Sequence, residues 1–132
     1  MINNEELFQY WLADMDDAID GFRSRLPEIV AQKLDYSKTS LVTISTWLIT
    51  NYLTVESIKK DSEKTSLDGA ARYIGQTFRK HLGGKWVIDY MNEKNAFYGL
   101  PQLAEMKGQR VQQCPHTLVT VTIGRKDPNF LI

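Results

Sequence analysis

The sequence has few of the residues on which common kinds of functional site depend. Its 132 residues include one cysteine, Cys114, and two histidines, His81 and His116. A single cysteine cannot form an intramolecular disulfide, so we expect a protein of a reducing compartment, the cytoplasm. A zinc site needs three or four suitable ligands, which this set of side chains does not supply. The sequence therefore predicts no metal site, and we expect no cofactor.

Long apolar runs and an excess of either charge are also lacking. No run approaches the roughly 20 apolar residues of a membrane-spanning helix, and the acidic start of the chain is unlike the basic start of a secretory signal. Its 16 acidic and 16 basic side chains cancel, which argues against the basic surface of a nucleic-acid-binding protein. We predict a protein that binds neither membranes nor nucleic acid.

Charge is nevertheless distributed unevenly along the chain. Residues 1–66 carry a net charge of −4 and residues 67–132 carry +4, and the first 20 residues hold six acidic side chains and no basic one. An acidic helical face can meet a basic partner, repel nucleic acid or only face water, and the last role is the commonest.

Hydrophobic residues make up 42% of the chain, which suits one domain spanning residues 1–132. Their spacing is helical over about 4–26, 38–52 and 66–82. Asp35 or Ser37 can cap the second of these helices. Pro27 ends the first helix, and a short helical turn is expected after it.

From Lys85 onward the apolar period changes from about 3.6 to 2, which is typical of strands. The pattern predicts a small antiparallel sheet over about 85–90, 95–100 and 109–113, with a hairpin turn at 92–95. The last element, about 115–124, fits a helix or a strand, and Pro115 at its start favours a helix. The predicted fold class is α+β, with the helices packed on the sheet.

Glycines mark the third helix and its end. Gly75 inside the helix costs about 1 kcal/mol relative to alanine, which suggests that another backbone, that of a crossing helix, approaches there. Gly83 and Gly84 can end the helix and reverse the chain. Trp86 should then be the first core residue of the sheet.

Several short motifs resemble those of a family of small, poorly characterised bacterial α+β domains, whose members read LDYS, then YLGE, then GGxW. Here the matching residues are Leu34 to Ser37, Tyr73 to Gln76, and Gly83 to Trp86. Gln76 stands where the family pattern has glutamate. The resemblance implies a stand-alone cytosolic protein related to some members found beside toxin and immunity genes. It implies no catalytic residues.

Motifs that would carry catalysis are incomplete. Cys114 and His116 flank Pro115, which disturbs a nucleophile–base geometry, and a buried inert thiol is the more common case. Gly83-Gly84-Lys85 follows a helix, whereas a phosphate loop precedes one. Asp16 and Asp17 are adjacent on a helix and point about 100° apart, unlike the paired carboxylates of a glycosidase.

Two hypotheses of function follow. The first is a non-catalytic cytosolic binding protein, an immunity protein or adaptor that neutralises a protein partner such as a toxin by surface complementarity. Its predicted contact residues are Asp14, Asp16, Asp17, Asp20, Tyr98 and Leu100. The second is a small enzyme or ligand-binding domain with a pocket between the third helix and the sheet. Its predicted pocket residues are Tyr73, Arg79, Trp86 and His116. The sequence does not fix an oligomeric state.

Overall fold

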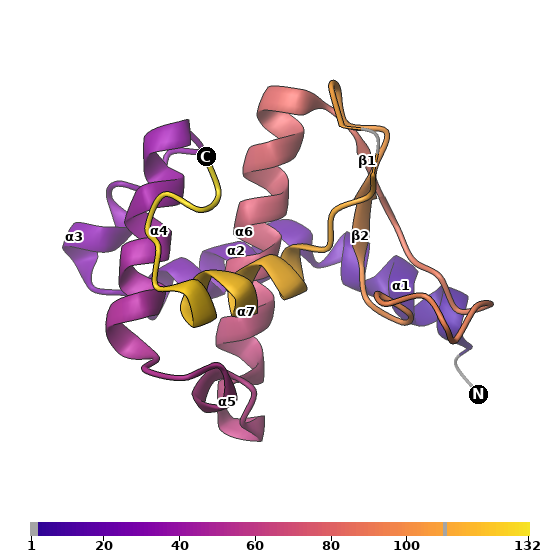
Figure 1. Cartoon of the computed structure of the whole chain (residues 1–132), viewed down its shortest axis with the longest axis horizontal. Helices are drawn as coiled ribbons and strands as arrows, with labels where there is room; N and C mark the ends of the chain where they lie inside the picture. Colours follow the sequence, from indigo (N-terminus) through magenta and orange to yellow (C-terminus); the bar gives the residue numbers. More distant parts are fainter. Residues whose placement is uncertain (1–2, 110) are drawn as a thin grey trace.

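The computed structural model describes residues 3–109 and 111–132, and these form a mainly helical α+β fold around one central helix, α6 (Figure 1). The helices are α1 (Asn4–Ala13), α2 (Met15–Ser24), α3 (Glu28–Ala31), α4 (Lys38–Asn51), α5 (Val55–Ile58), η1 (Asp61–Glu63), α6 (Lys64–Leu82) and α7 (Pro115–Arg125). The strands are β1 (Lys85–Val87) and β2 (Gln102–Ala104). The predicted fold class is confirmed.

The first helix is broken, so the prediction of one helix over 4–26 is wrong. α1 ends and α2 begins around Asp14, whose backbone angles are φ −86° and ψ 4°. Arg72 Nη1 donates to the Trp11 carbonyl oxygen at 2.8 Å. In a continuous helix that oxygen would accept the Met15 N–H. The bend thus lies where a side chain of α6 binds the backbone of α1.

The second and third predicted helices are present as α4 and α6. Ser37 caps α4, its hydroxyl oxygen accepting the Ser40 N–H at 3.1 Å. α6 begins at Lys64, two residues earlier than predicted, and residues 69–75 along its middle are all buried. In Figure 1, α7 crosses in front of α6 and α2 passes behind it. The centre of the core therefore lies around α6.

Gly75 faces a side chain, so the prediction of a helix backbone crossing there is wrong. A Cβ atom at Gly75 would collide with the Trp86 indole of β1 and lie 3.2 Å from Pro115 Cγ. At Gly69, about one and a half turns earlier, the neighbour is also a side chain: a Cβ atom there would lie 2.6 Å from Phe22 Cβ of α2. Gly69 and Gly75 of α6 thus leave space for two aromatic rings, those of Phe22 from α2 and Trp86 from β1.

The sheet is smaller than predicted. β1 pairs antiparallel with β2, with Trp86 opposite Leu103. The predicted strands 95–100 and 109–113 are wrong: residues 95–100 form turns, and Gln113 makes only an isolated bridge to Leu103. Arg110 of the latter segment lies outside the described residues.

Residues 88–101 form a loop, because Asp89 binds it internally. The Asp89 carboxylate accepts the N–H groups of Met91 (2.8 Å) and Asn92 (3.1 Å) and the Asn95 side-chain amide (2.9 Å). The Gly99 N–H donates to the Asp89 carbonyl oxygen at 2.8 Å and has φ +71°. These local bonds replace the ladder that a hairpin would have made.

The last element is a helix, α7, with Pro115 in its first turn as the sequence favoured. Val119 and Ile123 are buried against the core, and Cys114, just before the helix, is buried as well. Its β-branched residues are compatible with a helix because packing on α4 and α6 outweighs their intrinsic preference.

The residues that carry the family resemblance contact one another along α6. The Tyr73 hydroxyl donates to Ser40 Oγ at 2.7 Å and accepts the Tyr36 N–H at 2.9 Å. Gln76 Oε1 accepts the Trp86 indole N–H at 2.9 Å. These motif residues join α4, α6 and β1.

Over the described ranges, 3–109 and 111–132, no helix combines the length and the apolar character required to cross a bilayer.

Candidate functional site

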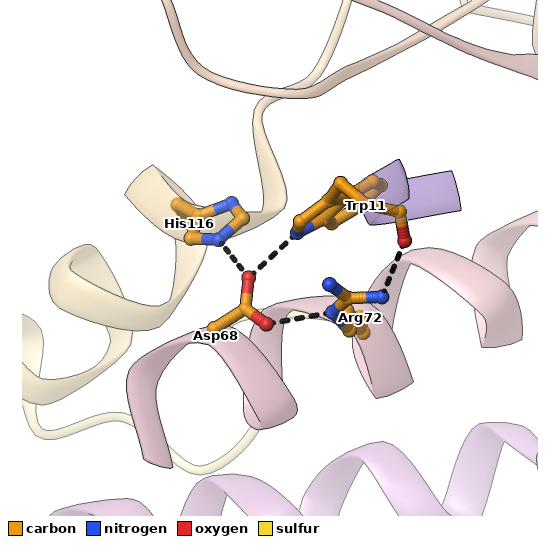
Figure 2. Close-up of polar contacts among 4 residues, drawn as sticks. All are labelled: Trp11, Asp68, Arg72 and His116. Carbon is orange, nitrogen blue, oxygen red and sulfur yellow. Dashed lines mark hydrogen bonds and ion pairs between the residues drawn. The ribbon is translucent and has the colours of Figure 1, made fainter. Parts of the chain in front are cut away.

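Four side chains from three helices meet in one polar cluster at the junction of α1, α6 and α7 (Figure 2). Asp68 Oδ1 accepts the Trp11 indole N–H at 2.8 Å and lies 3.0 Å from His116 Nε2. Asp68 Oδ2 accepts Arg72 Nε–H at 2.6 Å. We call Trp11, Asp68, Arg72 and His116 the Asp68 cluster.

Arg72 is the most deeply buried charged group of the cluster, with 3% of its surface exposed. Besides its ion pair with Asp68, its guanidinium carbon lies 4.2 Å from the centre of the Trp11 ring. A buried guanidinium is costly unless its donors and its charge have partners. The carboxylate, the Trp11 carbonyl oxygen and the indole face together supply them.

Asp68 is ionised in this environment. Burial alone raises the pKa of this carboxyl, but the hydrogen bonds from His116, Trp11 and Arg72 outweigh that effect and lower the pKa from 3.8 to about 2. An ionised carboxylate only accepts hydrogen bonds, so His116 Nε2 must carry the hydrogen that lies toward it. The cluster therefore fixes the imidazole as an Nε2 donor.

His116 Nδ1 decides what the cluster can do chemically. This atom is buried and has no hydrogen-bond partner among the residues that the structure describes. A histidine held by a carboxylate acts as a general base when its other nitrogen reaches a substrate, within about 3 Å. Nδ1 is shielded from solvent here, and the four side chains form a fixed junction of three helices (Figure 2).

Cys114 lies two residues before His116, beside the Asp68 cluster. Cys114 is 1% exposed, while the Nε2 atom of its neighbour His116 is engaged by Asp68. Within residues 3–109 and 111–132, no group of three or more histidine, cysteine, aspartate or glutamate side chains is arranged to hold a metal ion.

A surface groove of about 280 Å³ lies beside the cluster, between α1 and the loop 88–101. Its lining residues are Leu7, Phe8, Trp11, Asp68, Ile88, Tyr90, Gly99, Pro101 and His116. Tyr90 also packs edge to face against Tyr98, with ring centres 6.2 Å apart. The Asp68 cluster thus positions α1 against this aromatic loop.

The predicted partner-binding residues lie at the start of α2, along α2 and on the loop 88–101. Asp14, Asp16, Asp17 and Asp20 are all exposed, on the side of α2 opposite its buried residues Met15, Ile19 and Phe22. Tyr98 and Leu100 are each 37% exposed on the loop that forms the groove with α1. Both halves of the predicted surface are therefore accessible.

The four residues of the alternative pocket are only partly brought together. Trp86 and His116 both pack around Trp11, with ring centres 4.9 and 6.2 Å from it. Tyr73 is fully buried and binds α4, and Arg79 is exposed, donating to the Gly84 carbonyl oxygen at 3.2 Å. These two point to other parts of the molecule.

Sequence reasoning did not predict Trp11, Asp68 and Arg72 as a cluster. The signal available was the pair Asp68 and Arg72, an acid and a base four residues apart beside the small residues Gly69, Ala70 and Ala71. Opposite charges at this spacing share one helix face. Where that face also carries glycine and alanine, the pair is a candidate for burial against another element.

Comparison with known proteins found no match to this chain among family models, curated proteins or solved structures.

Proposed function

We propose that this protein is a non-catalytic binding protein that neutralises a basic protein partner through the face formed by α1, α2 and the loop 88–101. One observation carries the proposal. All six acidic side chains of residues 3–22 are exposed, and that stretch contains no basic residue. Their positions are Glu5, Glu6, Asp14, Asp16, Asp17 and Asp20.

These acids are available to a partner. Among the described residues, the ion pairs formed by lysine and arginine lie elsewhere, at Lys64–Asp61, Arg72–Asp68 and Lys85–Glu105. Unpaired charge of one sign on one face raises the rate of association with an oppositely charged partner and disfavours other partners.

Exposed apolar side chains on α1 and on the loop 88–101 supply anchors. Leu7 is 50% exposed and Tyr10 61% exposed on α1, and Tyr98 and Leu100 are each 37% exposed on the loop. Aromatic and apolar anchors surrounded by charge are typical of the residues that dominate binding energy in protein interfaces.

The family resemblance suggests that the partner is a toxin, because some members of that family are found beside toxin and immunity genes. Toxins that act on anionic substrates carry basic active sites, which an acidic protein face can occupy. We therefore propose an immunity protein or adaptor that acts in the bacterial cytoplasm. A chain with one cysteine forms no intramolecular disulfide, which suits that reducing compartment.

Charge reversal on α2 tests the proposal. The chain is expressed in its native host with a purification tag, and the variant Asp16→Lys/Asp17→Lys/Asp20→Lys is compared with a matched control, Glu56→Lys/Asp61→Lys/Asp127→Lys. The control makes the same charge change at exposed residues away from α1 and α2. We expect a basic protein to co-purify with the wild type and the control and to be lost from the α2 variant. Equal retention by both variants would contradict the proposal.

A further inference from the structure

A second cavity lies at the other end of α6, beside the C-terminal segment that runs back between α4 and α6 (Figure 1). Its volume is about 390 Å³. Most of its wall is apolar, and the apolar lining residues are Leu41, Phe78, Leu82, Met106, Leu118, Phe130, Leu131 and Ile132. Volumes of roughly 300–1,000 Å³ with apolar walls are typical of small-molecule sites.

The walls of this cavity come from separate elements. Leu41 of α4 and Met106 of the loop after β2 are buried, while Phe78 of α6 and Leu118 of α7 are half-buried. Leu41 and Met106 belong to the core and Phe78 packs against it, so these walls have a fixed shape. A fixed apolar cavity binds without a large cost of ordering its own side chains.

The charged side chain that lines this cavity is Lys38. Its polar lining residues are Lys38, His81, Gln109 and Gln113, and no aspartate or glutamate is among the lining residues. Lys38 is exposed at the first turn of α4. Arg125 adds a second cation behind the wall, with its guanidinium carbon 4.9 Å from the centre of the Phe130 ring.

His81 is held at the cavity by the backbone. His81 Nε2 lies 2.8 Å from the Tyr36 carbonyl oxygen, which can only accept, so Nε2 carries the hydrogen. Tyr36 adopts a left-handed conformation (φ +63°), and its ring stacks on Tyr73 with centres 4.9 Å apart. In this tautomer Nδ1 is a hydrogen-bond acceptor, so His81 borders the cavity without donating a hydrogen bond to an anionic ligand.

We propose that this cavity binds an amphipathic carboxylate, with the apolar chain against the Leu41, Phe78 and Leu118 walls and the carboxylate beside Lys38. The apolar lining suits an apolar body, and the Lys38 ammonium at the rim suits an anionic head. The volume of about 390 Å³ lies in the range of small-molecule sites, so carboxylates with medium-length alkyl chains are suitable probes. This site uses other elements than the acidic face and does not depend on the proposed function.

Isothermal titration with octanoate and decanoate, below their micellar concentrations, tests the site. Octylamine and decylamine are the matched probes of opposite charge. We expect saturable one-to-one binding of the carboxylates, tighter for decanoate because each added methylene contributes about fourfold in affinity. The amines should bind at least tenfold more weakly. Absence of carboxylate binding, or equal binding of the amines, would overturn the proposal.

Two variants locate the binding. Lys38→Gln removes the cation at the rim and should weaken decanoate binding about fivefold to tenfold. Lys33→Gln makes the same charge change in a different groove, between α3 and α4, and should leave the affinity unchanged. Equal effects of the two substitutions would show that only net charge matters and would overturn the site.

Filling the cavity gives an independent measurement. Leu118→Trp replaces an aliphatic side chain in the wall by a bulky indole and should reduce decanoate affinity at least tenfold. Circular dichroism and the melting temperature establish whether the variant is folded. In wild-type protein, methyl and aromatic NMR signals of Leu41, Phe78 and Leu118 should shift on binding. Undiminished affinity in the folded variant would place the ligand elsewhere and contradict the proposal.

Discussion

Asp68 shows how one side chain connects distant parts of the sequence. Its carboxylate binds Trp11 of α1, Arg72 of α6 and His116 of α7. Hydrogen bonds to an ionised group contribute more than neutral ones, and removing one partner of a buried ion pair leaves the other uncompensated. The two predictions at the scale of residues concern this carboxylate and Gln76.

The first prediction is that Asp68→Asn lowers the free energy of unfolding and removes part of its pH dependence. At neutral pH we expect a loss of about 3–5 kcal/mol, because Arg72 stays buried without its counter-charge. The wild-type pKa is lowered from 3.8 to about 2, so the contribution of ionisation is present above about pH 4 and is lost as pH falls through 2.

Urea unfolding from pH 7 to pH 2 measures this effect. The difference between wild type and Asp68→Asn should narrow by about 2 kcal/mol below pH 4. Asp61→Asn is the control, because the Asp61 side chain is 96% exposed in its pair with Lys64 and should change stability by less than about 1 kcal/mol. A difference independent of pH would contradict the role of Asp68 ionisation.

The second prediction is that Gln76→Glu is tolerated. Gln76 Oε1 accepts from Trp86 Nε1 at 2.9 Å and from Arg79 Nη1 at 3.1 Å, and a carboxylate oxygen can accept both. We expect an unchanged or slightly raised melting temperature, whereas Gln76→Leu should cost about 1–2 kcal/mol because the Trp86 N–H loses its partner. Differential scanning calorimetry compares the two. Equal losses for both substitutions would show that the acceptor oxygen is not what matters.

At the scale of elements, α6 and β1 are joined by the packing of Trp86 over Gly75. Glycine inside a helix is unfavourable in isolation, but here the missing side chain is the space that the indole occupies. The sequence identified Gly75 as a close contact and identified Trp86 as a core residue. It could not identify them as partners, since nothing in the local pattern of either residue specifies the other.

The third prediction is that Gly75→Ala destabilises the protein by about 1–3 kcal/mol, although alanine is the better helix former. Gly21→Ala in α2 is the matched control: its Cβ atom would have only Arg25 Nη1, at 3.5 Å, within contact distance. That variant should gain about 0.5–1 kcal/mol. Chemical denaturation measures the free energy of unfolding of both variants. In a Trp86→Leu background, Gly75→Ala should lower that free energy only slightly, because the indole is no longer there to collide with the new methyl group. A full cost in that background would assign the strain to another contact.

The elements that could be predicted were those with a clear apolar period. α4 and α6 follow the repeat of their buried residues, and Ser37 and Gly83 mark the start of α4 and the end of α6. The pattern of α7 fitted a helix or a strand, and only Pro115 at its start favoured the helix. The break at Asp14 was missed because the apolar stripe continues through it. The bend depends on Arg72, which is far along the sequence.

The hairpin was mispredicted for a related reason. Ala96 to Leu100 has the aromatic and apolar composition of a strand, but the Asp89 carboxylate binds backbone N–H groups two and three residues later and folds the segment into turns. The true partner strand, Gln102–Ala104, is buried at all three residues and includes a polar Gln102. It shows no alternation that sequence reasoning could detect.

At the scale of the whole molecule, stability should fall from α6 toward the groove-forming loop. Residues 69–75 of α6 are buried, whereas Met91 to Lys94 are exposed. Local opening requires little free energy where few apolar contacts are lost and where hydrogen bonds already face water.

The fourth prediction is a corresponding gradient of hydrogen exchange. Amides of residues 70–77 should exchange slowest, near the rate set by global unfolding, and those of residues 91–96 should exchange fastest. Hydrogen exchange followed by mass spectrometry or NMR measures both. Exchange in α6 as fast as in the loop would show that α6 is not the centre of the stable core.

The Trp11–Trp86 pair also provides the molecule with a built-in optical probe. The two indoles lie edge to face with centres 4.9 Å apart, one on α1 and the other on β1, while Trp47 packs separately against Phe22 and Tyr52. Chromophores this close couple electronically, so their near-ultraviolet circular dichroism depends on their separation. Undocking of α1 would abolish that signal while the environment of Trp47 stayed intact, so spectroscopy of the unmodified chain can distinguish movement of α1 from unfolding of the core.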